Sequence, residues 1–230
     1  MKTIGLLGGM SWESTAHYYR GLNKRVKAKL GGLHSAKIAM VSLDFAPIEK
    51  LQHQGDWDAT ANILIEAAKV VEAAGADFLM ICTNTMHEVT PKIEVQISIP
   101  ILHIADATAD VIKEKGIKKV GLLGTAFTME RDFYKGRLSD KHDIEVITPS
   151  IDERKIVHDV IYKELCLGTI KDTSKAAYLI IINRLAKEGA EAVILGCTEI
   201  GMLVNQSDTD VILLDTTEIH AEKAVILATE

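Results

Sequence analysis

Ile4-Gly-Leu-Leu-Gly8, close to the start of the chain, recurs almost unchanged as Val120-Gly-Leu-Leu-Gly124. A second pair follows in the same order, since Gly75-Ala-Asp-Phe-Leu-Met-Ile-Cys-Thr83 returns as Gly189-Ala-Glu-Ala-Val-Ile-Leu-Gly-Cys197. The two pairs are offset by 116 and 114 residues. Similarity at one nearly constant offset is typical of a duplicated structural unit. We therefore expect a first lobe of residues 1–98 and a second lobe of residues 99–206, with residues 207–230 packing back on the first lobe.

Short apolar runs alternate with amphipathic stretches of helix length along the chain, which is the pattern of a parallel-sheet α/β protein. The predicted fold class is therefore α/β, with two similar doubly wound parallel-sheet lobes related by a pseudo-two-fold axis. The active site is expected between the lobes. The expected strands are Thr3–Leu7, Ile38–Leu43, Phe78–Cys82, Ile99–Ile104, Val120–Leu123, Glu145–Ile147, Ala192–Leu195 and Val211–Leu214.

Composition restricts the function further. The 230 residues are 47% hydrophobic and 25% charged, with a formal charge of -6, and this charge argues against a nucleic-acid partner. No apolar run approaches the length that crosses a membrane, so we expect no membrane association. The three cysteines have no metal-type spacing, which favours a reducing, cytoplasmic location and predicts no metal site.

The repeat also identifies candidate chemical groups. Ligands of open parallel sheets bind beyond the carboxyl ends of the strands, and the second repeated pair places Thr83 opposite Cys197 at that edge. Two acid/base groups on opposite sides of one carbon are what a racemase needs, because one removes the α-proton and the other delivers a proton to the opposite face. The neighbouring Cys82 side chain points the other way in an extended strand and is expected to be packing.

The two candidate groups are unequal. A thiol can serve as a base if its pKa is lowered, and we expect a helix N-terminus together with a hydrogen bond from Thr198 or Asn84 to lower the pKa of Cys197. The Thr83 hydroxyl is a far weaker acid, so an asymmetric reaction biased toward one enantiomer as substrate is expected. Helix capping is a competing explanation for Thr83, and His87 reads first as a structural histidine.

Four segments resemble the aspartate/glutamate racemase family, and the resemblance covers essentially the whole chain. They are Gly5-Leu-Leu-Gly-Gly-Met-Ser-Trp-Glu-Ser14, Cys82-Thr-Asn-Thr-Met-His87, Leu122-Leu-Gly-Thr125 and Gly196-Cys-Thr-Glu199. The resemblance implies two α/β lobes, an inter-lobe site, no cofactor (in particular no pyridoxal phosphate) and a homodimer. The family's usual first-lobe motif is Cys-Asn-Thr, whereas Thr83 stands here at the cysteine position. This departure resembles a branch specific for L-aspartate and L-glutamate.

The resemblance also implies a set of groups that contact a small acidic amino acid. These substrate-binding residues are Met10, Ser11, Gln52, Asn84, Thr85, Thr125, Thr198 and Glu199, with Glu199 included chiefly for its backbone N–H. Gln52 rests only on its place after the second expected strand. A family Lys before Gly168 has no counterpart here, where Lys163 and Cys166 stand instead.

Two other functions remain open from the residues. A decarboxylase or isomerase of small dicarboxylates would need only one cysteine, and carbon dioxide release or product analysis with maleate would identify it. A two-lobed binding protein would sense an acidic metabolite without chemistry, and its ligand binding would survive Cys197→Ala. The leading prediction is a cofactor-independent racemase of aspartate or glutamate that uses Thr83 and Cys197.

Overall fold

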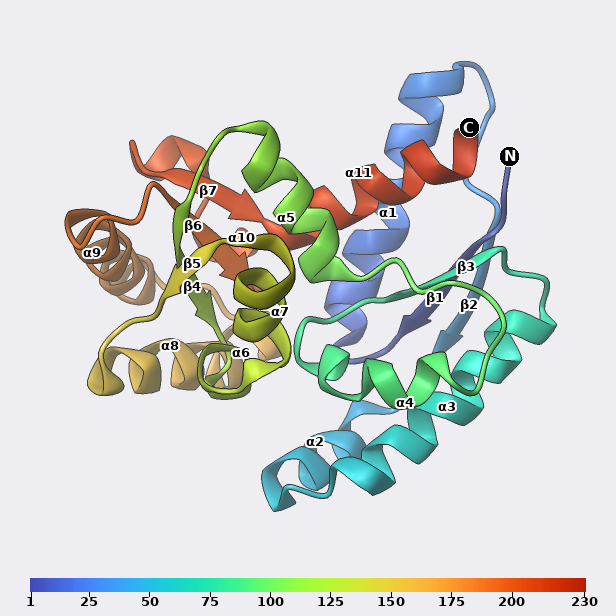
Figure 1. Cartoon of the computed structure of the whole chain (residues 1–230), viewed down its shortest axis with the longest axis horizontal. Helices are drawn as coiled ribbons and strands as arrows, with labels where there is room; N and C mark the ends of the chain where they lie inside the picture. Colours follow the sequence, from blue (N-terminus) through green and yellow to red (C-terminus); the bar gives the residue numbers. More distant parts are fainter. The chain divides into compact units, whose positions relative to one another are not determined.

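A computed structural model describes all residues 1–230 and divides them into two compact units. Unit 1 comprises Met1–Ile104 together with His220–Glu230, and unit 2 comprises Ala105–Ile219. Figure 1 shows the two chain ends close together in unit 1, where the backbone N–H of Lys2 donates to the carbonyl of Ala228 over 2.8 Å. Unit 1 is therefore discontinuous in sequence.

Unit 1 contains a three-stranded parallel sheet in the order β2-β1-β3. Its strands alternate in side-chain direction, so Leu7 and Ile81 pack toward α3 (Trp57–Ala73) while Leu6 and Met80 pack toward α1 (Trp12–Leu30) and α11 (Thr216–Thr229). Both faces are apolar, as expected for a parallel sheet. The elements are β1 (Ile4–Gly8), α1 (Trp12–Leu30), β2 (Ile38–Ser42), α2 (Phe45–Gln54), α3 (Trp57–Ala73), β3 (Phe78–Ile81), the 3-10 helix η1 (Thr85–Val89) and α4 (Thr90–Glu94).

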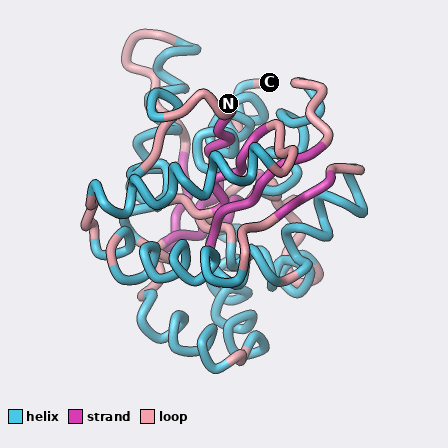
Figure 2. Tube along the Cα trace, turned by 90° about the vertical axis from the view of Figure 1, so that its left-hand side faces the viewer, coloured by secondary structure: helices cyan, strands magenta, loops and turns pink.

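Unit 2 repeats this topology and adds a strand, since its parallel sheet has the order β5-β4-β6-β7. The repeated strings form β1 and β4, and β3 and β6, and each pair of strands occupies the same place in its sheet. The elements are α5 (Ile104–Glu114), β4 (Lys119–Gly124), α6 (Ala126–Glu130), α7 (Asp132–His142), β5 (Glu145–Ile147), α8 (Ile151–Lys163), η2 (Leu165–Leu167), α9 (Asp172–Lys187), β6 (Ala192–Gly196), α10 (Ile200–Leu203), η3 (Gln206–Asp208) and β7 (Ile212–Asp215). The last helix, α11 (Thr216–Thr229), begins in unit 2 and continues into unit 1 from His220. Figure 2 shows helices flanking the strands.

Two details differ from the sequence expectation. Residues 99–104 form no strand but run beside β3 through one bridge, Leu79 to Ile101, so they stay with unit 1 instead of opening the second lobe at residue 99. The strand near residue 212 pairs with β6 in the second sheet, so the return to unit 1 occurs at His220 and not at residue 207. Strand pairing decided both boundaries, and pairing partners are not encoded in local hydrophobic pattern.

Candidate functional site

The loop after β1 is fixed by one glycine and one helix cap. Gly9 has φ of 89°, and a Cβ there would lie 2.1 Å from the carbonyl oxygen of Leu43, so no other residue fits without moving the backbone. Ser11 caps α1 by accepting a hydrogen bond from Ser14 N at 3.2 Å. The Thr15 hydroxyl accepts from Gly9 N at 2.8 Å and donates to the Ser11 carbonyl at 2.9 Å. The loop that carries Met10 and Ser11 is therefore braced by the first turn of α1.

The turn after β3 separates a core residue from a partly exposed one. Cys82 is fully buried in the core beneath α1, and burial raises the pKa of its thiol far above the usual value. Thr83 is half-buried in the bend that follows. Asn84 and Thr85 are buried at the start of η1, and the Ser14 hydroxyl donates to the Cys82 carbonyl at 3.0 Å. This bond joins the turn after β3 to the beginning of α1.

Gln52 reaches the same turn from α2. Its side chain is 1% exposed, and Nε2 lies 3.8 Å from the sulfur of Met86 in η1. The Gln52 carbonyl oxygen Oε1 is buried and has no hydrogen-bond partner within the protein. Met10 packs in the same apolar cluster as Met86. The structure thus gathers the predicted unit 1 residues around the carboxyl ends of β1 and β3 and the end of α2.

Unit 2 presents the corresponding edge of its sheet. Gly124 of β4 is paired with Gly196 of β6, so Thr125 and Cys197 follow two adjacent strand ends. A Cβ on Gly196 would lie 2.7 Å from the carbonyl oxygen of Leu123, which explains glycine before the cysteine. Thr125 caps α6 by accepting from Thr128 N at 3.3 Å. The sheet register therefore places Thr125 beside the cysteine turn.

Glu199 makes the closest polar contact of the cysteine. The Cys197 thiol donates to Glu199 Oε2 over 2.9 Å, and the Thr198 hydroxyl donates to the same oxygen over 2.7 Å. All three residues are buried, with exposed fractions of 8% or less. Burial, reinforced by the adjacent Glu199 carboxylate, raises the pKa of Cys197 well above its usual value.

The expectation of a lowered Cys197 pKa is therefore wrong. The Thr198 hydroxyl, which was expected to donate a hydrogen bond to Cys197, donates to Glu199 instead. The Cys197 thiol is itself a hydrogen-bond donor and not an acceptor. Glu199 contributes its side chain to this turn, not only the backbone N–H for which it was selected. Thr83 belongs to unit 1 and Cys197 to unit 2, and their apposition across a cleft stays a prediction.

Several polar residues beside these turns were not selected from the sequence. His158 of α8 accepts from Ala126 N at 3.1 Å and so anchors the start of α6. Asp215 ends β7 beside β6 and accepts from Thr217 N at 2.9 Å, and the buried Thr217 hydroxyl has no partner within the protein. An Asp-Thr-Thr string directly after a strand was an available signal for the second group, whereas His158 had none.

The structure holds no group of three or more His, Cys, Asp or Glu side chains arranged to bind a metal ion. None of its helices combines the length and the apolar character that crossing a membrane requires.

The fold and the site define a two-unit, parallel-sheet α/β protein in which each unit has a polar turn beyond its central strands. The profile of the Asp/Glu/hydantoin racemase family matches residues 7–224, and the chain belongs to this family. The family and the α/β class with two parallel-sheet lobes, both predicted from the sequence, are confirmed.

Solved structures and a curated relative agree with this assignment. A candidate Asp/Glu racemase from Yersinia pestis is 54% identical, with a TM-score of 0.93 and full coverage of both chains. An aspartate racemase homologue from Pyrococcus horikoshii OT3 is 35% identical, with a TM-score of 0.87 and full coverage of both chains. The broad-specificity amino-acid racemase RacX of Bacillus subtilis (strain 168) is 22% identical over 96% of each chain.

Proposed function

We propose that the protein interconverts the enantiomers of aspartate or glutamate without a cofactor, with Cys197 and Thr83 as the two acid/base groups. The observation that carries this proposal is the contact between the Cys197 thiol and the Glu199 carboxylate, 2.9 Å apart in a buried turn. A buried thiol is a poor base until its proton leaves, and Glu199 Oε2 is positioned to receive that proton. Family membership supports the reaction class.

In the proposed reaction one proton leaves the α-carbon and another is delivered to its opposite face. The thiol proton of Cys197 moves to Glu199, and the resulting thiolate accepts the α-proton on one face of the substrate. The Thr83 hydroxyl delivers a proton to the other face and regains one from solvent, while Glu199 releases to solvent the proton that it took from the thiol, so that the site returns to its starting state. Backbone N–H groups at the starts of α1, η1 and α6, held by the caps and contacts described above, would stabilise the charge that develops at the substrate carboxylate.

Substrate choice and direction are part of the proposal. Aspartate and glutamate are favoured by the names of the two structural relatives, while RacX is described as having broad specificity, so neutral amino acids belong in the same assay. The thiol side and the hydroxyl side differ in acidity, which predicts a bias toward one enantiomer, and the L enantiomer is proposed because Thr83 at the cysteine position resembles the branch specific for L-aspartate and L-glutamate. Met10, Ser11, Gln52, Asn84, Thr85, Thr125, Thr198 and Glu199 are proposed to line the bound substrate.

The direct test is exchange of the Cα proton in deuterated water with each enantiomer, followed by chiral analysis. Exchange and inversion with aspartate or glutamate, both lost in Cys197→Ala, are expected. Ligand binding without exchange in the intact protein would overturn the proposal and favour a binding protein.

One observation favours a second candidate. Cys82 is fully buried in the core, so Cys197 is the thiol available at the predicted site. A decarboxylase or isomerase of small dicarboxylates needs only one thiol. Carbon dioxide release from substituted malonates, or conversion of maleate, in the absence of racemisation would establish this alternative.

The expected homodimer is likewise proposed, through a face of α1 and β2. A groove of about 660 Å³ lies there, and its wall includes the exposed Trp12, Tyr19 and Met40. Glu13 and Arg20 are opposite charges on α1 that lie on either side of Ala16. Two antiparallel copies of α1 crossing near Ala16 would bring Glu13 of each copy toward Arg20 of the other, which favours a second copy as the occupant.

A further inference from the structure

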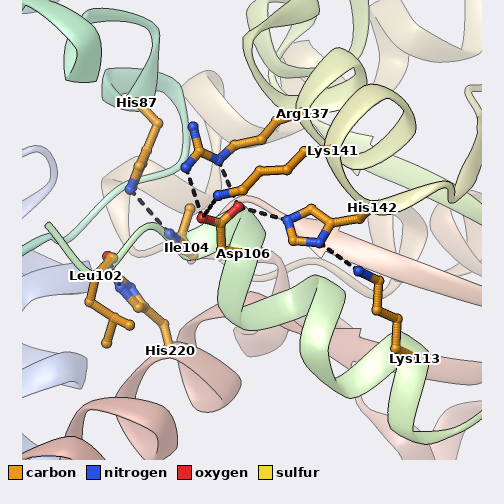
Figure 3. A network of polar contacts seen from close by, with 9 residues as sticks. All are labelled: His87, Leu102, Ile104, Asp106, Lys113, Arg137, Lys141, His142 and His220. Carbon is orange, nitrogen blue, oxygen red and sulfur yellow. Dashed lines mark hydrogen bonds and ion pairs between the residues drawn. The ribbon is translucent and has the colours of Figure 1, made fainter.

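His87 connects the Thr83 turn to the segment through which the chain leaves unit 1. The side chain is 1% exposed and lies in η1, four residues after Thr83. Its Nδ1 atom is 2.9 Å from the Thr83 carbonyl oxygen, and its Nε2 atom is 3.3 Å from the backbone nitrogen of Ile104. Figure 3 shows the second contact, with the ring directed at the first residue of α5.

The two contacts determine which ring nitrogen carries the proton. A backbone N–H can only donate, so Nε2 of His87 must accept from Ile104 and cannot itself be protonated. The proton of the neutral ring therefore sits on Nδ1 and is donated to the Thr83 carbonyl. The ring also supplies an acceptor to one of the first N–H groups of α5, which have no partner inside the helix.

The surroundings restrict the rotation of this ring. The His103 ring lies against it with centroids 4.4 Å apart, and the His220 ring lies 6.3 Å away. Both neighbours are buried, and His220 is itself held by the Tyr18 hydroxyl at 3.0 Å and the Leu102 carbonyl at 2.8 Å. A bound ring of this kind has little freedom to rotate, so it fixes the backbone groups that it joins.

We infer that His87 is a positioning residue for Thr83, whose carbonyl it holds so that the hydroxyl of the same residue keeps the direction needed for proton delivery. The inference rests on the proposed function. A small error in the direction of an acid/base group costs rate at that group alone. Loss of the His87 contact is therefore expected to impair the Thr83 face and to spare the Cys197 face.

The rates of α-proton exchange and of inversion, measured together, distinguish a positioning role of His87 from a general loss of folded enzyme. With the substrate enantiomer that faces Cys197, exchange of the α-proton with retained configuration needs only the thiol, whereas inversion also needs Thr83. In His87→Leu we expect inversion to fall about tenfold or more relative to exchange. A proportional fall of both rates, or no fall, overturns the inference.

Two amide variants make the test sharper. The Asn amide can place its N–H near the position of Nδ1, while the Gln amide, one methylene longer, reaches the position of Nε2. His87→Asn should therefore retain the wild-type ratio of inversion to exchange better than His87→Gln. The reverse order overturns the inference. Val89→Ala, in the same 3-10 helix and equally buried, serves as the control and should leave the ratio unchanged.

A measurement on the wild-type protein that needs no turnover tests the His87 contact even if a variant misfolds or the substrate is wrong. The ¹⁵N NMR spectrum of the wild-type protein with labelled histidine should show His87 protonated at Nδ1. A ring protonated at Nε2 overturns the inference whatever the reaction. If the wild type neither exchanges nor inverts any amino acid, the proposed function fails, and this spectrum alone decides whether His87 holds the turn.

Discussion

The sulfur of Cys197 lies 2.9 Å from Oε2 of Glu199, and the thiol donates its proton to that oxygen. The contact has opposite effects at rest and during a reaction. At rest the adjacent carboxylate adds to the effect of burial and raises the pKa of the thiol. During a reaction the same carboxylate can take up the proton, so that a thiolate forms without charge being added to the site.

Replacing this carboxylate should therefore make Cys197 more acidic and yet less effective. In Glu199→Gln we expect alkylation of Cys197 by iodoacetamide to begin at lower pH than in the wild type, because a charge that raises its pKa is gone. We also expect kcat to fall about 10²-fold to 10⁴-fold, since the proton acceptor is lost. Mass spectrometry of the alkylated protein and chiral analysis of product measure the two effects. An unchanged kcat in Glu199→Gln would contradict the proposed proton transfer.

Thr83→Cys should make the reaction more symmetric. A thiol at this position is a stronger acid than the native hydroxyl, so protonation and deprotonation on that face become easier. We expect the less reactive enantiomer to gain rate relative to the other. Initial rates from the pure L and D enantiomers give the ratio, and a ratio that does not move toward one would argue against Thr83 as the second group.

His220 should make the protein lose stability in mild acid. Burial, with a contribution from nearby His87, lowers the pKa of His220 to about 3, below its unfolded value of 6.5. The unfolded chain then binds more protons than the folded protein between these values, so this stabilisation is complete above pH 6.5 and is lost as pH falls toward 3. The loss is at most about 1.4 kcal/mol per pH unit. Urea unfolding between pH 7 and pH 4 measures it, and His220→Gln, which cannot titrate, should show a flatter profile.

Asp106 should contribute to stability through an ion-pair network in unit 2. Burial opposes its ionisation, but hydrogen bonds from Arg137, Lys141 and His142, each 2.7 or 2.8 Å long, hold the pKa of Asp106 far below its usual range (Figure 3). This contribution is present above the unfolded pKa near 4 and disappears only in stronger acid. Asp106→Asn is expected to lower the free energy of unfolding by about 1–3 kcal/mol.

Asp159→Asn is the control for that measurement. Asp159 also contacts two lysines, Lys155 and Lys163, but these side chains are 74% and 70% exposed, whereas Arg137 beside Asp106 is 27% exposed. Water and salt screen such pairs, so no measurable change in urea unfolding is expected. Equal losses in the two variants would show that burial does not distinguish the networks.

The proposed dimer depends on one charged pair across α1. Glu13→Arg and Arg20→Glu should each place like charges together and weaken association, while the double variant should restore it. Trp12→Ser should also weaken association because it removes an exposed aromatic side chain from the proposed interface. Sedimentation analysis measures the dissociation constant. Ile180→Ser, with a comparably exposed side chain on α9, is the control, and a monomeric wild type would contradict the proposal.

Much of the architecture followed from local pattern. The repeated strings predicted strands that the structure forms as β1, β4, β3 and β6, and the glycines Gly124 and Gly196 lie where a neighbouring strand approaches closely. The turns that carry Thr83 and Cys197 could be identified because polar residues follow buried strands at the edge where parallel sheets bind ligands. Family membership rested on these same segments.

Only the tertiary structure decided which strands pair and which side chains contact one another. Non-local strand pairing placed residues 99–104 beside β3 and β7 beside β6. The exact direction of side chains brought the Glu199 carboxylate to Cys197 and the His87 ring between Thr83 and Ile104. The raised pKa of Cys197 also depends on tertiary structure. Sequence spacing indicates which groups are near a helix N-terminus, but burial and one carboxylate oxygen 2.9 Å away determine which protonation state is favoured.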